Sequence, residues 1–519
     1  MASHARYALA IDLGTGGPKA ALVAEDGTVA ARAARSVATR FEPGVGAEQA
    51  PEAVWRATLE TAREVVAAAA AAPEAIAAVI CSAQFSSIVG VDRAGRAVTP
   101  LLLWMSRRGE RHSRRILEER PEALGTWLER HGAVPLGPDS LSHMLYVRYE
   151  NPAAYERTAA FLEPVDFLNL RLTGRAAATA CTAFLMLLTD GRDPGTTRYD
   201  PTLVELSGLD AAKLPELLPV DARIGPLLPE VARELGLPAE TPVLAGVNDT
   251  QAVTLGTGTF RAGHGGLNVG TTMQVLAAAP EKKTDIEAQI VSMPSPLGGY
   301  LTMAEMGLGG RVLEHFLREL VHARDPLGGE PAPDPFAGLD EAVRATPAGA
   351  GGVVFLPWLA GAQAPREDPS ARGAFLNLSL GTSRARLARA VLEGLACQLR
   401  WMLPAVERFA GAHFGELTFS GGGARSDAWA RILADATGRP ILQLADPQQA
   451  NTRGVAFLAF VRLGLASTDD VERFRPIRRR YEPEEEARSR YDELFGRFVE
   501  AYEALQPLYA RWTGGAAAG

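Results

Sequence analysis

The fold is decided near the start of the chain by Ala8-Leu-Ala-Ile-Asp-Leu-Gly-Thr-Gly-Gly-Pro-Lys-Ala-Ala-Leu-Val23. This stretch predicts an apolar strand, a glycine-rich turn and a second apolar strand. Glycines lack a Cβ, so the turn permits unusual backbone angles and close approach by another group. Consecutive backbone N–H groups in such a turn can surround an anion. We therefore interpret the turn, with Gly14, Thr15 and Lys19 in or beside it, as a candidate phosphate site; an ordinary hairpin turn is the alternative.

Asp12 lies beside the same turn. A carboxylate next to a phosphate would be repelled, so Asp12 makes chemical sense mainly if a divalent cation lies between the two. Mg²⁺ is the usual partner of nucleotide phosphates. The alternative is a solvated aspartate with no ligand.

Composition limits the classes of protein that fit. The 519 residues suggest roughly three to four domain-sized units, or two large ones, and 47% hydrophobic with 22% charged residues is typical of a globular protein. The net charge of −8 argues against nucleic acid or an anionic membrane surface as the main partner. The three cysteines are far apart and odd in number, which argues against a disulfide framework or a metal cluster. With no signal peptide and no apolar run of ~20 residues, we expect a cytoplasmic protein.

The first half of the chain predicts a mixed α/β unit. Three strands fill residues 6–40, a helix begins at Pro51, and Ile76 to Ser82 is suited to a buried strand. Residues 86–91 and 98–104 are further strand candidates. Residues 105–240 are more irregular, with a helix over 166–174 closed by Gly174, and we interpret them as an insertion that holds a substrate.

A second candidate site follows the apolar strand that begins at Thr241 and ends in Gly246. Asn248 and Asp249 come directly after this strand, and a helix of small residues begins there. A carboxylate just past the end of a buried strand is where α/β folds place their chemistry. The alternative is an aspartate that only caps the helix.

The opening pattern then recurs. Leu267-Asn-Val-Gly-Thr-Thr-Met-Gln-Val-Leu276 predicts strand, turn and strand again, which suggests two domains built alike and facing one nucleotide, with the boundary near residue 255. Leu417-Thr-Phe-Ser-Gly-Gly-Gly-Ala424, followed by a helix over 426–437, outlines a third anion cradle. We also expect a strand over 352–358, a helix over 382–403 and a terminal amphipathic helix over 484–512 that packs on the second domain.

These motifs, in this order, resemble the FGGY family of carbohydrate kinases over about residues 7–508. The resemblance implies an α/β fold of two actin-like ATPase (ribonuclease H-like) domains around a central cleft: residues 1–255 for sugar binding and the catalytic base, and 256–519 for ATP. Among family members the xylulokinase-like branch is the nearest. The motifs that carry the resemblance are Asp12-Leu-Gly-Thr with Lys19, Val247-Asn-Asp-Thr-Gln-Ala252, Gly270-Thr-Thr272, Gly309 and Gly310, Leu356 to Pro365 with Asp368 to Phe375, and Phe419 to Asp427.

The resemblance implies direct phosphoryl transfer from ATP to a hydroxyl group of a small sugar or polyol. Asp249 would be the general base, and Asp12 would hold Mg²⁺. The residues implied for ATP are Gly14, Thr15, Lys19, Gly270, Thr271, Thr272, Gly310, Gly422, Gly423, Ala424 and Asp427. Those implied for the sugar are Gln84, Trp104, Arg107 and Arg108, together with Asp249. For the two arginines an ion pair at the surface is the alternative, and for Gln84 a buried structural role.

The sugar side departs from the family pattern. The usual Gly-Gln-Met-His-Gly is Ala83-Gln-Phe-Ser-Ser87 here, and the usual Trp-x-Asp-x-Arg has Ser106 in place of the aspartate. His143 replaces a common lysine and Thr179 a common aspartate. Asn377 and Arg386 stand where glycine and a smaller polar residue are expected. The nucleotide side is well kept, so phosphorylation is a safer prediction than any named sugar.

Several functions stay open at this point. The best match is a kinase for a pentulose such as xylulose; kinases for glycerol, ribulose, erythritol or gluconate are alternatives. A sugar-responsive family member without catalysis, and a chaperone-type ATPase of the same fold, are others. A Rossmann dehydrogenase is weaker, because Asp12-Leu-Gly-Thr-Gly-Gly17 lacks the Gly-x-Gly-x-x-Gly spacing. The expected partner is a small molecule, with neither nucleic acid nor membrane involved, and the resemblance is compatible with a homodimer.

Overall fold

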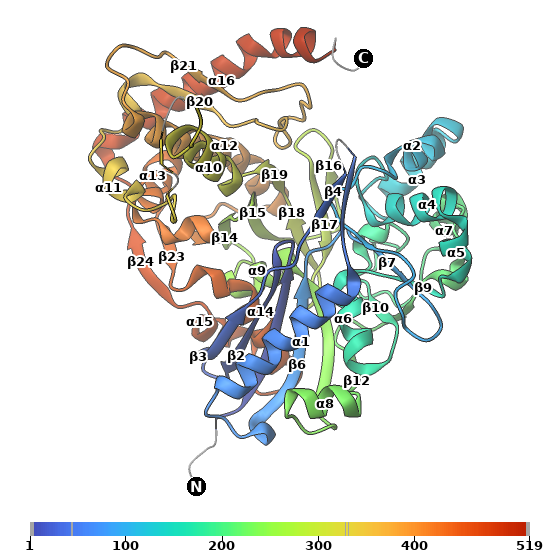
Figure 1. The fold of residues 1–519 in the computed structure, drawn as a ribbon. Helices are drawn as coiled ribbons and strands as arrows, with labels where there is room; N and C mark the ends of the chain where they lie inside the picture. Colours follow the sequence, from blue (N-terminus) through green and yellow to red (C-terminus); the bar gives the residue numbers. More distant parts are fainter. Residues whose placement is uncertain (1–4, 43–44, 327–328, 331, 515–519) are drawn as a thin grey trace.

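The computed structural model describes residues 5–42, 45–326, 329–330 and 332–514. Two β-sheets lie on either side of a central pair of helices, and a helical lobe (residues 105–162 and 178–217) extends from the first sheet (Figure 1). Within these described ranges, every helix is too short or too polar to cross a membrane.

The first sheet has the strand order β12-β13-β6-β1-β2-β3. Strand β1 is antiparallel to β2 and parallel to β6, and β6 is parallel to β13. Alternate residues of β1 face opposite sides: Leu9 and Ile11 join one apolar core, and Ala8 and Ala10 another. The strands are β1 (Tyr7–Gly14), β2 (Gly17–Ala24), β3 (Val29–Ala34), β6 (Ile76–Ala83), β12 (Arg223–Pro226) and β13 (Pro242–Asn248).

The second sheet repeats this arrangement. Its path is β16-β17-β18-β15-β14-β22-β23-β24, with β19 paired to β15. Strand β14 is antiparallel to β15 and parallel to β22, which is parallel to β23, as in the first sheet. The predicted pair of similar domains is confirmed. The strands are β14 (Gly265–Val269), β15 (Thr272–Ala279), β16 (Thr284–Asp285), β17 (Ile290–Pro294), β18 (Tyr300–Met303), β19 (Glu305–Leu308), β22 (Leu417–Ser420), β23 (Ile441–Leu444) and β24 (Ile477–Tyr481).

Helices α9 (Asp249–Thr257) and α14 (Ala450–Arg462) cross between the sheets (Figure 1). They touch through glycines: a Cβ on Gly256 would lie 1.9 Å from the carbonyl oxygen of Ala450, and one on Gly454 would lie 2.0 Å from that of Ala252. Helix α14 connects β23 and β24 of the second sheet in sequence but packs its apolar side, including Val455, on the first sheet. The two halves are therefore interlocked at the centre.

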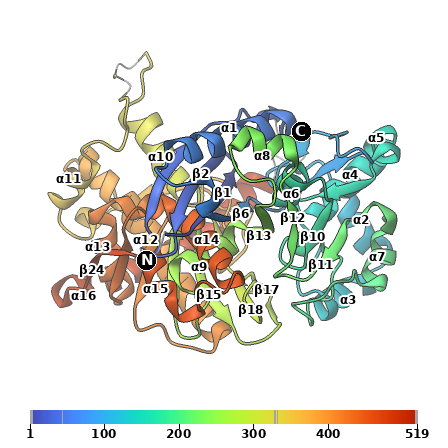
Figure 2. The ribbon, with the colours of Figure 1, turned by 90° about the horizontal axis from the view of Figure 1, so that it is seen from below.

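The outer faces of both sheets are covered by helices. Helices α1 (Pro51–Ala68), α6 (Pro164–Thr173) and α8 (Pro229–Leu235) cover the first sheet on the side away from α9 and α14 (Figure 2). The second sheet is covered by α10 (Gly310–His315), α11 (Leu339–Arg344), α12 (Arg384–Ala410), α13 (Asp427–Thr437) and α16 (Glu485–Gly514). The expected packing of the terminal helix on the second domain is confirmed by the buried side chains of Tyr491 and Phe498.

Some predicted elements differ in length. The strands expected over 86–91 and 98–104 are only β7 (Val89–Val91) and β8 (Leu101–Leu102), because Ser86 has a left-handed φ of 59° and the loop is held by side-chain hydrogen bonds. The helix expected to end at 403 continues through Pro404 to Ala410, where its apolar face still packs into the core. The helix closed by Gly174, which has a φ of 78°, is confirmed.

The region expected to be irregular contains a lobe with its own apolar core around Trp127 and Phe161. Its helices are α2 (Glu110–Glu119), α3 (Glu122–Arg130), α4 (Ser140–Glu150), α5 (Pro152–Arg157) and α7 (Pro201–Ser207). The sequence predicts α2, as a polar helix over about 111–120, and the structure confirms it. The other short helices of the lobe depend on tertiary packing, so the sequence pattern did not reveal them.

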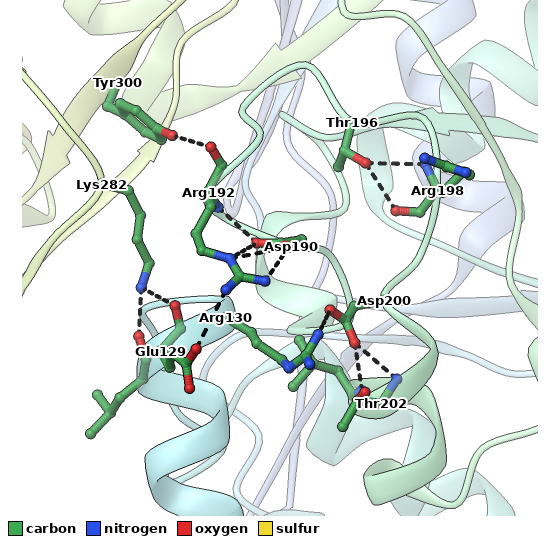
Figure 3. Close-up of polar contacts among 12 residues, drawn as sticks. Glu129, Arg130, Asp190, Arg192, Thr196, Arg198, Asp200, Thr202, Lys282 and Tyr300 are labelled. Atoms are coloured by element: carbon green, nitrogen blue, oxygen red, sulfur yellow. Dashed lines mark hydrogen bonds and ion pairs between the residues drawn. The ribbon is translucent and has the colours of Figure 1, made fainter.

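The helical lobe contacts the second domain through hydrogen bonds (Figure 3). Lys282 Nζ donates to the carbonyl oxygens of Leu128 at 2.6 Å and Glu129 at 2.7 Å. The Tyr300 hydroxyl donates to the carbonyl oxygen of Arg192 at 3.0 Å. In the lobe, Asp190 forms an ion pair of 2.7 Å with the Arg192 guanidinium, which fixes the loop that receives Tyr300.

Candidate active site

Three parallel strands of the first sheet end at a common edge. Asp12 near the end of β1 is in register with Ser82 of β6, and Ser82 is in register with Val247 near the end of β13. Asp249 follows β13 directly. Because parallel strands carry their functional groups at their carboxyl ends, the two predicted carboxylates Asp12 and Asp249 come together at this edge.

Asp12 is buried, with 3% of its surface exposed. Its Oδ1 accepts hydrogen bonds from Ser82 Oγ at 2.8 Å and from Asn451 Nδ2 at 3.1 Å. Lys19 lies directly opposite Asp12 in the β1–β2 register. Neither Ser82 nor Asn451 was predicted for the site.

Asp249 is the first residue of α9. Asn248 caps this helix in a reciprocal capping box with Gln251, which fixes the backbone that presents the carboxylate. Burial, then the nearby negative charges of Asp12 and Glu305, raises the pKa of Asp249 to about 8. A carboxylate with a raised pKa at a cleft edge is a candidate base.

Glu305 of β19 is a third carboxylate near Asp249, and no motif in the sequence marks it. Burial raises its pKa as well, and a hydrogen bond with Thr272 opposes that shift. Within the described ranges there is no group of three or more His, Cys, Asp or Glu side chains that could hold a metal by itself. Mg²⁺ commonly uses one or two carboxylates, waters and substrate phosphates, so the oxygen ligands here suit a metal that enters with a nucleotide.

Side chains from three segments interlock beside Asp12. The Thr15 hydroxyl donates to Gln84 Oε1 at 2.7 Å and accepts from Trp104 Nε1 at 3.0 Å. Gln49, which was not predicted, donates to the Thr15 carbonyl oxygen at 2.8 Å. Gln84 Nε2 is buried with no partner within the described structure, so it is a donor left for a ligand. We call Thr15, Gln49, Gln84 and Trp104 the polar network.

The two predicted arginines are both paired with carboxylates. Arg107 forms an ion pair of 2.8 Å with Glu110, and 60% of its side chain is exposed. The Arg108 side chain is 11% exposed and forms an ion pair of 2.8 Å with Glu48 of β5 (Gly46–Gln49). Arg108 also donates to Ser106, the residue that replaces the family's aspartate, at 3.1 Å. Arg108 is therefore held by both Glu48 and Ser106.

The first two glycine turns are tight two-strand connections. Gly14 is in register with Gly17, so Thr15 and Gly16 form the loop, and only Gly17 has a left-handed φ, of 130°. In the second sheet, the carbonyl oxygen of Gly270 accepts from the N–H of Gly310 at 2.8 Å. That of Thr271 accepts from Gly309 at 2.9 Å. The predicted Gly270–Thr272 turn and the glycine pair thus form one unit.

The third turn follows β22. Gly421 has a φ of 82°, and a Cβ on Gly423 would lie 2.9 Å from the Trp429 ring, whereas one on Gly422 would meet nothing within 4 Å. The predicted Ala424 and Asp427 are both held by one amide: Gln443 Nε2 donates to the Ala424 carbonyl oxygen at 2.8 Å and to Asp427 Oδ1 at 3.1 Å. Gly422 therefore faces open space.

The other residues that depart from the family pattern lie in different parts of the molecule. His143 is buried in the helical lobe, and its Nε2–H donates to the Ser86 carbonyl oxygen at 3.1 Å. Burial lowers the pKa of His143 to about 4. Thr179 lies in β10 (Ala177–Thr179) of the same lobe. Asn377 and Arg386 bond backbone oxygens of the second domain, Gly352 and Gly381. The last two do not join the polar network.

Comparison with known proteins gives the family. Residues 7–256 match the N-terminal domain of the FGGY family of carbohydrate kinases, and residues 266–463 match its C-terminal domain. The chain is 26% identical over 510 residues to a xylulose kinase of Bacillus subtilis (strain 168), covering 97% of this chain and 98% of the relative. It is 31% identical over 478 residues to a glycerol kinase of Thermus brockianus, covering 90% and 92%.

A solved structure shares the fold. The crystal structure of gluconate kinase from Lactobacillus acidophilus superposes with a TM-score of 0.85 at 22% identity, covering 98% of this chain and 100% of that one. The relatives carry three different substrate names at similar identity, so similarity by itself does not select a sugar.

Proposed function

The chain belongs to the FGGY family of carbohydrate kinases, which use ATP, and from this we propose that it transfers the γ-phosphoryl group of ATP to a hydroxyl group of a small neutral sugar or polyol. Xylulose or another pentulose is the first candidate. We further propose that two functional units divide near residue 255. The first binds the acceptor and carries the base, and the second binds ATP, with Gly14, Thr15 and Lys19 of the first also facing the phosphates.

The observation that carries this proposal is the position of Asp249. Its carboxylate begins a capped helix, lies near Asp12, and has a raised pKa of about 8. Such a group accepts a hydroxyl proton more readily than an ordinary aspartate does. Asp249 takes the proton of the acceptor hydroxyl as the oxygen attacks the γ-phosphoryl group in line.

The glycine turns support the nucleotide half of the proposal. Turns with little side chain let backbone N–H groups approach phosphates, and most of the rate in phosphoryl transfer comes from positioning and charge neutralisation. Asp12 would hold Mg²⁺, which supplies positive charge at the phosphates when bound. Asp12→Ala should therefore weaken the use of Mg²⁺ and ATP, and an unchanged metal titration would remove this assignment.

The state of the arginines supports a neutral acceptor. Arg107 and Arg108, the two cations expected beside the acceptor, are neutralised by Glu110 and Glu48. A carboxylate on the substrate, as in gluconate, would need an unpaired cation there. Gln84 Nε2 instead offers an uncharged donor, which suits a hydroxyl or carbonyl oxygen.

The deciding experiment measures ADP release by purified protein with Mg²⁺ and ATP. The panel contains xylulose, ribulose, erythritol, glycerol, hexuloses and gluconate, each against a sugar-free control. One neutral sugar that raises ADP release far above the control supports the proposal and names the substrate. Gluconate as the best substrate would contradict the neutral acceptor.

A flat panel needs a second measurement, by calorimetry. If the protein binds both ATP and a sugar but does not turn over, the result would favour a sugar-responsive family member without catalysis. ATP turnover that no sugar stimulates would favour a plain ATPase of this fold. Either result would overturn the proposed transfer.

A further inference from the structure

Asn451 contacts the carboxylate that the proposed function gives to the metal. It is the second residue of α14, and its Nδ2 donates to Asp12 Oδ1 at 3.1 Å across a sequence separation of 439 residues. Nothing in the sequence motifs marks Asn451. We propose that it is a positioning residue: it fixes the Asp12 carboxylate so that Oδ2 faces the cation of the metal–nucleotide complex.

The geometry at Oδ1 supports this role. Ser82 Oγ donates to the same oxygen at 2.8 Å, so two donors from two sides define the plane of the carboxylate. A carboxylate oxygen has about two acceptor positions, so Oδ1 is fully used and Oδ2 is the oxygen that remains. In the described ranges, no protein donor is bonded to Oδ2, and Asp12 is almost fully buried.

Helix α14 holds Asn451 firmly in place. Gly454, three residues further along, contacts α9 so closely that a Cβ there would lie 2.0 Å from the carbonyl oxygen of Ala252. At the other end of α14, the Arg462 guanidinium donates to the carbonyl oxygens of Ala245 and Val220 in the first half. Both ends of α14 are therefore tied to the first half of the chain, which keeps Asn451 beside Asp12 in this structure.

The repeat of the fold explains why the residue lies there. Strand β13 leads to α9, which begins with Asp249, and β23 is the equivalent fifth strand that leads to α14. The start of α14 thus occupies in the second half the place that the base occupies in the first. The first half contributes the Asp249 carboxylate at this place. The second half contributes the Asn451 amide, which orients the Asp12 carboxylate.

The test compares four proteins: wild type, Asn451→Leu, Asn451→Gln and Ser82→Ala. Leucine has nearly the shape of asparagine but no donor, glutamine keeps a donor, and Ser82→Ala removes the matching bond from the first half. Calorimetry measures the affinity for ATP with Mg²⁺ and with EDTA. The Mg²⁺ concentration for half-maximal ADP release is measured where a sugar substrate is found.

Asn451→Leu and Ser82→Ala should each weaken ATP binding in Mg²⁺ by roughly tenfold, the usual effect of a lost hydrogen bond to a charged group. Binding in EDTA should stay at the wild-type value, and Asn451→Gln should recover part of the loss. Equal losses with and without Mg²⁺, or no loss in a folded Asn451→Leu protein, would overturn the inference.

The inference rests on the proposed function, but the two can fail separately. If no sugar is phosphorylated, the calorimetry still reports whether Asn451 acts on the metal–nucleotide complex. If a sugar is phosphorylated and the Mg²⁺ dependence of Asn451→Leu equals that of wild type, the inference alone is wrong.

Discussion

The glycine turns are held together by backbone hydrogen bonds, whereas the polar network is held together by side chains. The turn at Gly270 is closed by backbone hydrogen bonds to the carbonyl oxygens of Gly270 and Thr271. The polar network consists of side chains: Thr15 joins Gln84 to Trp104, and Gln49 holds the Thr15 backbone. A backbone surface tolerates few residues other than glycine, whereas side-chain contacts can be exchanged one by one. The nucleotide side should therefore change little among related kinases and the acceptor side much more.

The largest expected effect lies between the two regions, at Asp249. Asp249→Ala should lower turnover by ~10²–10⁴, the usual loss when a general base is removed, while nucleotide binding persists. Steady-state ADP release and calorimetry with Mg²⁺ and ATP would measure the two quantities. Full activity in the variant would mean that Asp249 is not the base.

A change at Gln84, the member of the polar network with a free donor, should affect the acceptor rather than ATP. Gln84→Leu removes the unpartnered Nε2 donor and the Oε1 that accepts from Thr15, so KM for the sugar should rise roughly thirtyfold. KM for ATP should stay near the wild-type value. Gln49→Leu is the matched control, because its amide holds the Thr15 backbone rather than a ligand. A Gln84→Leu protein whose KM for ATP rises as much as its KM for the sugar would break the distinction between the regions.

A change in a glycine turn should affect the nucleotide alone. Gly422→Ala adds a methyl group where no protein atom lies within 4 Å, so the protein should keep its melting temperature and lose roughly tenfold in ATP affinity. Gly423→Ala meets the Trp429 ring at 2.9 Å and should lower the melting temperature instead. If Gly422→Ala binds ATP normally, the third turn does not face the nucleotide.

The smallest expected effect concerns the contact between the second domain and the helical lobe, which closes over both regions. Lys282→Met removes the hydrogen bonds to Leu128 and Glu129, which join the second domain to the helical lobe. A cleft that closes less firmly admits water, so ADP release without sugar should rise about threefold relative to sugar-stimulated release. Lys283→Met is the control, since Lys283 lies over the Phe409 ring; identical ratios in both variants would contradict the role of Lys282.

The features that could be predicted from the sequence are those that depend on neighbouring residues. The glycine turns, the strand ending at Asn248 and the helix closed by Gly174 were predicted because each depends on a few neighbouring residues. The two similar domains followed from the repeated hairpin. These features are local in sequence, so a single stretch shows them.

The missed residues depend on contacts between distant segments. Asn451, Glu305 and Glu48 reach the site from other strands and helices, and no local pattern marks them. Asn451 could have been found by aligning the two halves and asking what occupies the place of Asp249. The pairing of Arg108 with Glu48 has no such signal, because a helical or strand period does not tell which carboxylate an arginine meets.

The crossing of α9 and α14 has a consequence for how this chain can change over generations. Gly256 and Gly454 face each other, and a methyl group on either would push the helices apart. Once the first substitution has widened the crossing, the second meets less resistance, so the two costs should not add. The positions are thus epistatic: a mutation at one changes which residues the other accepts, and selection acts on the pair as a single trait.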